Sequence, residues 1–428
     1  MHPSRRRSTA PARVPAVLLT VAVAASCLPT VAAETGRNGA DRDAWLPLTA
    51  AGDAPLPADP VLDTDDCRYD SRLPRAFDAD AARGPDTPEV RTVARPGPGG
   101  SGMDTCGTVA ADGMQLPSRL SLGSYVVYDV DTGDVLAAKD PYGLYRPASI
   151  IKILLVMVAL DTLDLDAQVP VTPEMVDIDG SRVGIGPGGH YTARQLLQGL
   201  VMASGNDAAL ALAEALGGKD ATVTKMQSLA DSLGVSATKV TTVNGLDTPD
   251  VQTTAWDMAL LYRAAFRRDD VRRLLGTQLI DFPGFDDHPG FQLSSDNGML
   301  YNYPGALGGK TGFTDNARHT YAAAAQRDGR TVGIVALNST IAAGRPWEQA
   351  EGIFDAAFGT PRGAGVGQLT DPAAAPAGAP ADRVAAAAGS ADTAGSGGTG
   401  QAVVTAAVVA TLVLILGGVA VLAVRRRR

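Results

Sequence analysis

The order of apolar and polar positions predicts one folded region, residues 107–361, in the middle of the chain. Two short apolar stretches, 124–128 and 135–138, flank Asp131-Thr132-Gly133 and have the composition of a β-hairpin. Apolar residues at helical spacing then predict helices at about 149–163, 192–203, 207–216, 222–233 and 254–266. Further strands are expected at 308–312, 319–325 and 331–338, and a last helix at 346–358. Because strands at both ends enclose a helical middle, the pattern predicts an α+β or three-layer fold whose terminal strands share one sheet.

The segments on either side of this region have a different composition. Residues 34–106 are rich in Asp, Pro, Arg and Gly with little apolar periodicity, which predicts an extended arm. Residues 362–401 are mostly Ala, Gly, Pro, Ser and Thr, which is typical of a flexible linker. Cys67 and Cys106 are a candidate disulfide in an oxidising compartment, with two free thiols as the alternative.

Both ends of the chain carry features of a membrane-associated, exported protein. Basic residues precede a short apolar run and a small-residue site before Glu34, so residues 1–33 are predicted to be a signal peptide. The alternative is a lipoprotein site at Cys27. Residues 402–424 are 23 positions without a charge, about 34 Å as a helix, and four arginines follow at 425–428. We therefore expect a single-pass anchor in the cell membrane with a cytoplasmic Arg tail, which places the folded region outside the membrane.

Charge and histidine content exclude other classes of function. The formal net charge is −9, and the eight arginines near the two termini leave the middle of the chain still more acidic. Such a domain repels phosphate backbones, so no nucleic-acid partner is expected. The four histidines stand in no metal-ligand spacing, and neither a metal nor a cofactor is predicted.

The first motif with catalytic chemistry is Ser149-Ile150-Ile151-Lys152. Pro147 favours a helix start just before it, and residues three apart share a helix face, so the Lys152 amine should lie beside the Ser149 hydroxyl. A serine nucleophile needs a base, and apolar neighbours such as Ile151 would lower the pKa of Lys152 towards the neutral amine. Taken alone, this pair is a weak indication, and a capping serine with a solvated lysine is the simpler interpretation.

Two further motifs are expected to join it. Ser204-Gly205-Asn206 lies at a break between two predicted helices, where the hydroxyl could relay a proton and the amide could hold a substrate carbonyl. Lys310 begins the run Lys310-Thr311-Gly312-Phe313-Thr314, which lies on a predicted strand. There, Gly312 would let a substrate backbone approach, and Lys310 with the two threonines would bind a carboxylate. The Lys310 charge would also lower the pKa of Lys152.

With these three motifs in this order, the region from about 110 to 360 resembles the D-alanyl-D-alanine carboxypeptidases, the low-molecular-mass penicillin-binding proteins. Asn244-Gly245-Leu246 and Gly308-Gly309 before Lys310 add to the likeness. The resemblance implies a β-lactamase/transpeptidase-like fold, with an antiparallel sheet and a helical subdomain. It also implies an acyl-enzyme on Ser149 that trims peptidoglycan stem peptides ending in D-Ala-D-Ala and is trapped by β-lactams. The backbone N–H groups of Ser149 and Phe313 would hold the oxyanion, and Arg345 is the candidate for the substrate carboxylate.

Three other interpretations compete with this one. A β-lactamase would need a deacylating glutamate, and no Glu occurs between Glu214 and Glu348, although an aspartate could replace it. A non-catalytic wall-binding ectodomain would not require both Lys152 and Lys310. Residues 184–189 match the glycine pattern of dinucleotide sites, but without a preceding strand and with Pro187 they predict a surface loop.

Overall fold

The computed structural model describes residues 61–78 and 81–371. The predicted signal peptide, the first part of the arm, residues 372–401 of the predicted linker, the predicted membrane span and the Arg tail lie outside the described residues. Within the described part of the chain, none of the helices has both the length and the apolar character needed to cross a bilayer.

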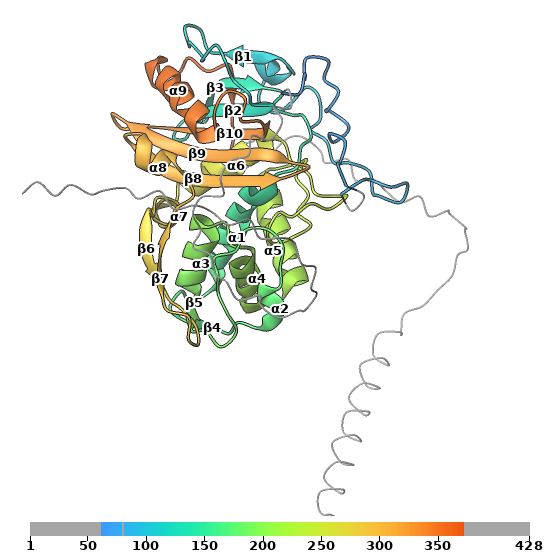
Figure 1. Ribbon diagram of the computed structural model, residues 1–428. Helices are drawn as coiled ribbons and strands as arrows, with labels where there is room; N and C mark the ends of the chain where they lie inside the picture. Colours follow the sequence, from blue (N-terminus) through green and yellow to red (C-terminus); the bar gives the residue numbers. More distant parts are fainter. Residues whose placement is uncertain (1–60, 79–80, 372–428) are drawn as a thin grey trace, which may run out of the picture. The chain divides into compact units, whose positions relative to one another are not determined.

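The core of the fold is one antiparallel sheet (Figure 1). Its strands follow the order β1-β3-β2-β10-β9-β8, and β11 pairs with β3. Their bounds are β1 Thr108–Ala110, β2 Ser124–Asp129, β3 Asp134–Lys139, β8 Ala306–Thr314, β9 Arg318–Arg327, β10 Arg330–Ser339 and β11 Gly367–Gln368. Because β2 pairs with β10, with Val126 opposite Val335, strands from both ends of the domain share the sheet. This confirms the arrangement predicted from the sequence.

The sheet is buried on both faces, which makes the fold three layers deep. Val126 and Tyr128 belong to one core, whereas Tyr125 and Val127 belong to the other, as the alternation of side chains along a strand requires. Helix α9, Pro346–Gly359, covers one face, and α6, Ala255–Phe266, packs on the other (Figure 1). The hydroxyl of Thr254 caps α6 by accepting from the Asp257 N–H.

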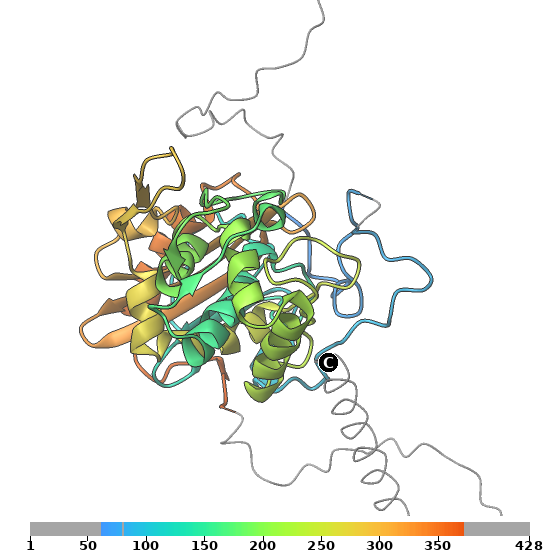
Figure 2. The same ribbon diagram turned by 90° about the horizontal axis from the view of Figure 1, so that it is seen from below.

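A helical subdomain lies beyond α6 on the same side of the sheet (Figure 2). Its central helix is α1, Lys152–Thr162, whose residues from Lys152 to Ala159 are all buried, as expected of a helix that is apolar all round. The other elements are α2 Pro173–Val176, α3 Ala193–Met202, α4 Asn206–Ala215, α5 Lys219–Ser232 and α7 Asp269–Leu275, with the short strands β4 Gln168–Val169, β5 Tyr191–Thr192, β6 Leu279–Phe282 and β7 Phe291–Ser294. Helix α8, Met299–Asn302, lies instead with α9, where Met299 belongs to the same core as Phe354. The five predicted helices are present within a few residues of their expected bounds, whereas α7 and the β6–β7 hairpin were not predicted.

The folded domain extends to residue 371, beyond the predicted boundary at 361. Strand β11 pairs with β3, and Leu369 is buried. The Arg263 guanidinium donates to the Leu369 carbonyl and forms an ion pair with Asp371 at 2.8 Å. Backbone pairing and one arginine hold residues 362–371 on the domain. Neither requires an apolar pattern, so the composition of these residues resembles that of a linker.

Residues 61–78 and 81–106 form a wrap on the domain, and these described residues contain one short helical turn, η1 Ser101–Met103. A disulfide joins Cys67 to Cys106. The segment is held at other points as well: the buried Arg146 guanidinium donates to the carbonyls of Pro74 and Ala81, at 3.2 and 2.8 Å. Further along, Gln252 donates to the Arg91 carbonyl at 2.7 Å. The described part of the arm is therefore irregular, and it is attached to the domain at several points besides the disulfide.

Candidate active site

Ser149 and Lys152 lie where the chain enters the central helix. A 3₁₀ turn, η2 Ala148–Ile151, precedes α1, and Lys152 is the first residue of the α-helix. The Lys152 Nζ donates to the Ser149 Oγ at 2.7 Å. Ala148 has a φ of 47°, a left-handed conformation that is uncommon for alanine and that directly precedes Ser149. The Ser149 hydroxyl and the Lys152 amine are therefore neighbours, as the sequence predicted.

The surroundings of Lys152 favour its neutral form. Its side chain is fully buried, and this burial is the largest cause of a pKa well below the ordinary value for lysine. The nearby Lys310 charge lowers the pKa further, whereas Asp296 and Asp207 oppose the shift. A neutral amine can accept a proton from Ser149, as a general base must.

The second motif meets Lys152 through Asn206. Its Oδ1 accepts from Lys152 Nζ at 2.8 Å, and its Nδ2 donates to the Asp179 carbonyl at 2.7 Å. The amide oxygen therefore accepts from Lys152, whereas a substrate carbonyl would accept from the other N–H of Nδ2, so the expected role of this amide stays a prediction. Ser204 is 5% exposed with a φ of 57°, and within the described residues no hydrogen bond links its hydroxyl to Ser149 or Lys152.

The third motif runs past the serine on β8. A Cβ built on Gly312 would lie 2.9 Å from the Ser149 backbone nitrogen, so only glycine allows this approach. The Thr320 hydroxyl on β9 donates to the Pro147 carbonyl at 2.8 Å and fixes η2 against the sheet. The start of η2 and the middle of β8 thus lie in direct contact, as an oxyanion site shared by Ser149 and Phe313 would require.

The other residues of this motif differ in their surroundings. Lys310 is buried, its Nζ donates to the Thr311 carbonyl at 2.8 Å, and burial lowers its pKa. The Thr311 hydroxyl donates to Asp296 at 2.7 Å. Phe313 is 46% exposed, with its ring 4.7 Å from that of His319. The Thr314 hydroxyl accepts from the Ala317 N–H at 3.0 Å and so stabilises the turn after β8.

Arg345 lies at the N-terminus of α9, across from the end of β8. Its backbone N–H donates to Glu348 at 2.6 Å. Its charge is near enough to lower the pKa of His319, after the larger effect of burial. The guanidinium therefore acts on His319, whose ring contacts that of Phe313 in the third motif.

Two aspartates of the site were missed by the sequence analysis. The buried Asp207 carboxylate accepts from the N–H groups of Val183, Gly184 and Ile185, and so orders the glycine-rich loop after α2. Its position directly after Ser204-Gly205-Asn206 could have revealed it. Asp296, which faces Thr311 and both lysines, stands in no local motif.

An antiparallel sheet with a helical subdomain, and a serine–lysine pair between them beside a second buried lysine, define the class of penicillin-binding proteins and serine β-lactamases. A family model for D-alanyl-D-alanine carboxypeptidases matches residues 111–340. The chain belongs to the D-alanyl-D-alanine carboxypeptidase family, and its fold and enzyme class are those that the sequence predicted.

Curated relatives agree with this assignment. The chain is 41% identical over 250 residues to the D-alanyl-D-alanine carboxypeptidase DacB2 of Mycobacterium tuberculosis, covering 58% of this chain and 85% of the relative. It is 30% identical over 224 residues to the D-alanyl-D-alanine carboxypeptidase DacF of Bacillus subtilis, covering 51% and 57% respectively. These relatives support neither the β-lactamase nor the non-catalytic alternative.

Solved structures show the same fold. A crystal structure of a D-alanyl-D-alanine carboxypeptidase from Mycobacterium tuberculosis is 40% identical with a TM-score of 0.58, covering 61% of this chain and all of that one. The Streptomyces K15 DD-transpeptidase is 26% identical with a TM-score of 0.54, covering 57% of this chain and all of that one.

Proposed function

We propose that this enzyme removes the terminal D-Ala from peptidoglycan stem peptides ending in D-Ala-D-Ala, through an acyl-enzyme on Ser149. The observation that carries the proposal is the 2.7 Å contact between the Ser149 hydroxyl and a fully buried Lys152 amine. An ammonium could not accept the proton, and burial lowers the pKa of Lys152, which favours the neutral amine.

Acylation uses residues on both sides of the site. The neutral Lys152 amine takes the Ser149 proton as Oγ forms a bond to the carbonyl carbon of the penultimate D-Ala. The backbone N–H groups of Ser149 and Phe313 stabilise the oxyanion. The C–N bond then breaks, and the leaving D-alanine amine receives the proton, by way of Lys152 and the Ser204 hydroxyl. Asn206 keeps the Lys152 amine at hydrogen-bond distance from Ser149.

Deacylation repeats the same proton transfers with water as the nucleophile. Lys152 takes a proton from water, which attacks the ester carbonyl, and the proton returns to Ser149 Oγ as the shortened peptide leaves. Lys310 and Thr311 bind the substrate carboxylate, and Arg345 adds a second cation nearby. Thr314, three residues further along β8, contacts the part of the peptide that precedes the scissile bond. Gly312 lets the substrate backbone lie against β8.

Two consequences concern partners and location. β-Lactams, which mimic the D-Ala-D-Ala terminus, acylate Ser149 and remain bound there. The family acts at the cell wall, and we place the catalytic domain outside the membrane on a tether formed by residues 402–424. The uncharged composition of that segment and the arginines at 425–428 support this placement.

The test is D-alanine release from a peptide ending in D-Ala-D-Ala, with the full chain beside its Ser149→Ala variant. Release by the unchanged protein alone is the expected result. Equal release by both proteins would rule out Ser149 as the nucleophile, and no release by the folded unchanged protein would rule out the carboxypeptidase reaction.

A further inference from the structure

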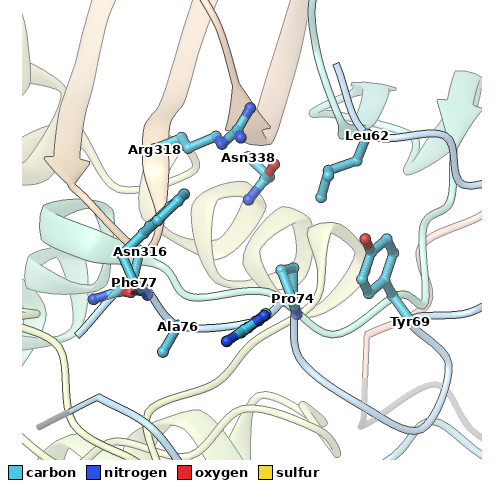
Figure 3. Close-up of a pocket in the computed structure, with 9 residues that line it drawn as sticks. Leu62, Tyr69, Pro74, Ala76, Phe77, Asn316, Arg318 and Asn338 are labelled. Atoms are coloured by element: carbon cyan, nitrogen blue, oxygen red, sulfur yellow. Dashed lines mark hydrogen bonds between the residues drawn. The ribbon is translucent and has the colours of Figure 1, made fainter. Parts of the chain in front are cut away.

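A cavity of about 420 Å³ lies between the N-terminal wrap and the turn that joins β8 to β9 (Figure 3). The wrap contributes Pro74, Arg75, Ala76 and Phe77, together with Leu62 and Tyr69 further back, and the sheet contributes Asn316, Arg318 and Asn338. In Figure 3, Arg318 and Asn338 lie on one side of the open space and Pro74 and Ala76 on the other. Ser149 and Lys152 are not among the lining residues, so the cavity is separate from the catalytic pair.

The wall contributed by the wrap is attached directly to the catalytic elements. The buried Asn316 accepts from the Phe77 N–H at 2.6 Å and donates to Asp78 and Asp247, at 2.6 and 2.9 Å. Arg146, three residues before Ser149, donates to the Pro74 carbonyl. The cavity wall therefore has a fixed position relative to the serine.

The direction of β8 connects the cavity to the reaction. In the proposed function, Lys310 and Thr311 bind the carboxylate that follows the scissile bond, and Gly312 lies against Ser149. The part of the peptide that precedes the scissile bond must then leave along β8 in the other direction, past Phe313 and towards the turn. Asn316 is four residues beyond Gly312, which is about 13 Å of extended strand. A peptide covers about 10–13 Å in three or four residues.

The cavity has unused hydrogen-bonding capacity that fits a peptide. Asn338 is 2% exposed, and its Oδ1 has no hydrogen-bond partner among the described residues. Its φ is 48°, at an irregularity in the pairing of β10 with β9, which turns the side chain out of the regular ladder. A buried amide without partners is costly, and a peptide group supplies the donor that Oδ1 lacks.

The charged side chains that line the cavity are both arginines. Arg75 is exposed, and no ion pair or hydrogen bond of its side chain is found within the described part of the chain. A guanidinium in this position favours a carboxylate, which it can bind with two parallel hydrogen bonds.

We infer that this cavity is a subsite for the part of the substrate peptide that precedes the terminal D-Ala-D-Ala, where Asn338 binds a peptide group and Arg75 a carboxylate. This inference rests on the proposed function and deepens it: it makes the enzyme selective for long, acidic stem peptides. The wrap would then serve substrate selection, a role that its irregular sequence did not reveal.

The test compares three synthetic peptides: acetyl-Lys-D-Ala-D-Ala, Ala-Glu-Lys-D-Ala-D-Ala and Ala-Gln-Lys-D-Ala-D-Ala. With the full chain, we expect kcat/KM to be about tenfold higher for the Glu pentapeptide than for the tripeptide, with the Gln pentapeptide in between. Arg75→Gln should remove the advantage of Glu over Gln and leave the tripeptide unaffected. Ala76→Trp, which fills the cavity, should reduce both pentapeptides to the level of the tripeptide. Arg72→Gln, an exposed arginine three residues away that does not line the cavity, is the matched control.

Binding of the same peptides to the Ser149→Ala variant keeps this test independent of catalysis. Tighter binding of the Glu pentapeptide, lost on adding Arg75→Gln, supports the subsite even if D-alanine release fails. Equal kcat/KM for the three peptides together with equal binding, or an equal loss for all three in Arg75→Gln, would overturn it. Absence of D-alanine release from every peptide would instead count against the proposed function.

Discussion

The Asp296 carboxylate accepts a hydrogen bond from the Thr311 hydroxyl at 2.7 Å and acts on both buried lysines of the site. It raises the pKa of Lys310 and of Lys152, against the larger lowering that burial causes in each. Lys310 acts on Lys152 in the opposite direction, because two neighbouring ammonium groups repel each other. The protonation of Lys152 therefore depends on the charges of Asp296 and Lys310, both of which can be removed by substitution.

We expect two variants to shift the pH dependence of acylation in opposite directions. Asp296→Asn keeps an acceptor for Thr311 but removes the charge that favours protonated Lys152. The pKa of Lys152 should then fall, and the acidic limb of the pH–rate profile should move to lower pH. Lys310→Gln removes the repulsion, so the pKa of Lys152 should rise and the limb should move to higher pH. The measurement is the rate of covalent labelling by a fluorescent penicillin between pH 5 and pH 10. Shifts in the same direction would contradict this electrostatic assignment.

Replacement of the base should abolish acylation without loss of the fold. In Lys152→Ala we expect the acylation rate to fall by about 10²–10⁴, the usual contribution of a positioned general base. Stopped-flow labelling with penicillin measures the rate, and circular dichroism checks the fold. Lys219→Ala, at an exposed lysine that starts α5, is the control and should label at the unchanged rate. A Lys152→Ala variant that labels as fast as the unchanged enzyme would exclude Lys152 as the general base.

The buried Asp140 should make the stability of the domain fall between about pH 4 and pH 7. Burial raises the pKa of Asp140 from 3.8 to about 7, although the hydroxyl of Tyr145 donates to it. The folded state binds the proton more tightly than the unfolded state, so the stabilisation is complete below pH 4 and is lost as the pH rises to 7. The loss is on the order of 4 kcal/mol. Urea unfolding from pH 4 to pH 8 should show this slope, and Asp140→Asn should remove it. The exposed Asp112→Asn should keep it; a flat profile in the unchanged protein would refute the prediction.

The ion pair between Arg330 and Asp129 should be far more important for stability than those at the surface. The two side chains are 5% and 2% exposed and 2.9 Å apart, and Arg330 also donates to the carbonyls of Ala357 and Thr360. Arg330→Met leaves a buried carboxylate without its counterion and should cost about 3–5 kcal/mol of unfolding free energy. Arg194→Met removes an exposed pair of similar length, to Asp166, and should cost about 1 kcal/mol or less. Similar losses for the two variants would contradict the prediction.

The Cys67–Cys106 disulfide should stabilise the domain chiefly by restricting the unfolded chain. It links residues 39 apart, so the Cys67→Ser/Cys106→Ser variant should lose about 3–4 kcal/mol in the chain-entropy model. Thermal unfolding of the oxidised protein and of this variant measures the difference. Equal melting temperatures would show that the other attachments of the wrap are sufficient.

The sequence predicted those elements that have a strong periodic pattern and a clear cap. Thr192 and Thr254, where two of the predicted helices begin, cap α3 and α6. Helix α7 and the β6–β7 hairpin were missed because they are short and their exposed positions weaken the apolar pattern. Residues 362–371 were assigned to a linker because two residues of backbone pairing leave no mark on composition.

Local sequence by itself determined that Ser149 and Lys152 share a helix face, and that Ser204, Asn206 and Lys310 were candidates to join them. Their order along the chain indicated the family. The tertiary structure alone decided that Asn206 contacts Lys152, that Gly312 lies against Ser149, and that Asp296 faces both lysines. It also decided that residues 74–77 line a cavity with Asn338, more than 250 positions away. The physical reason is that helix spacing is fixed by neighbouring residues, whereas contacts between distant segments depend on how the whole core packs.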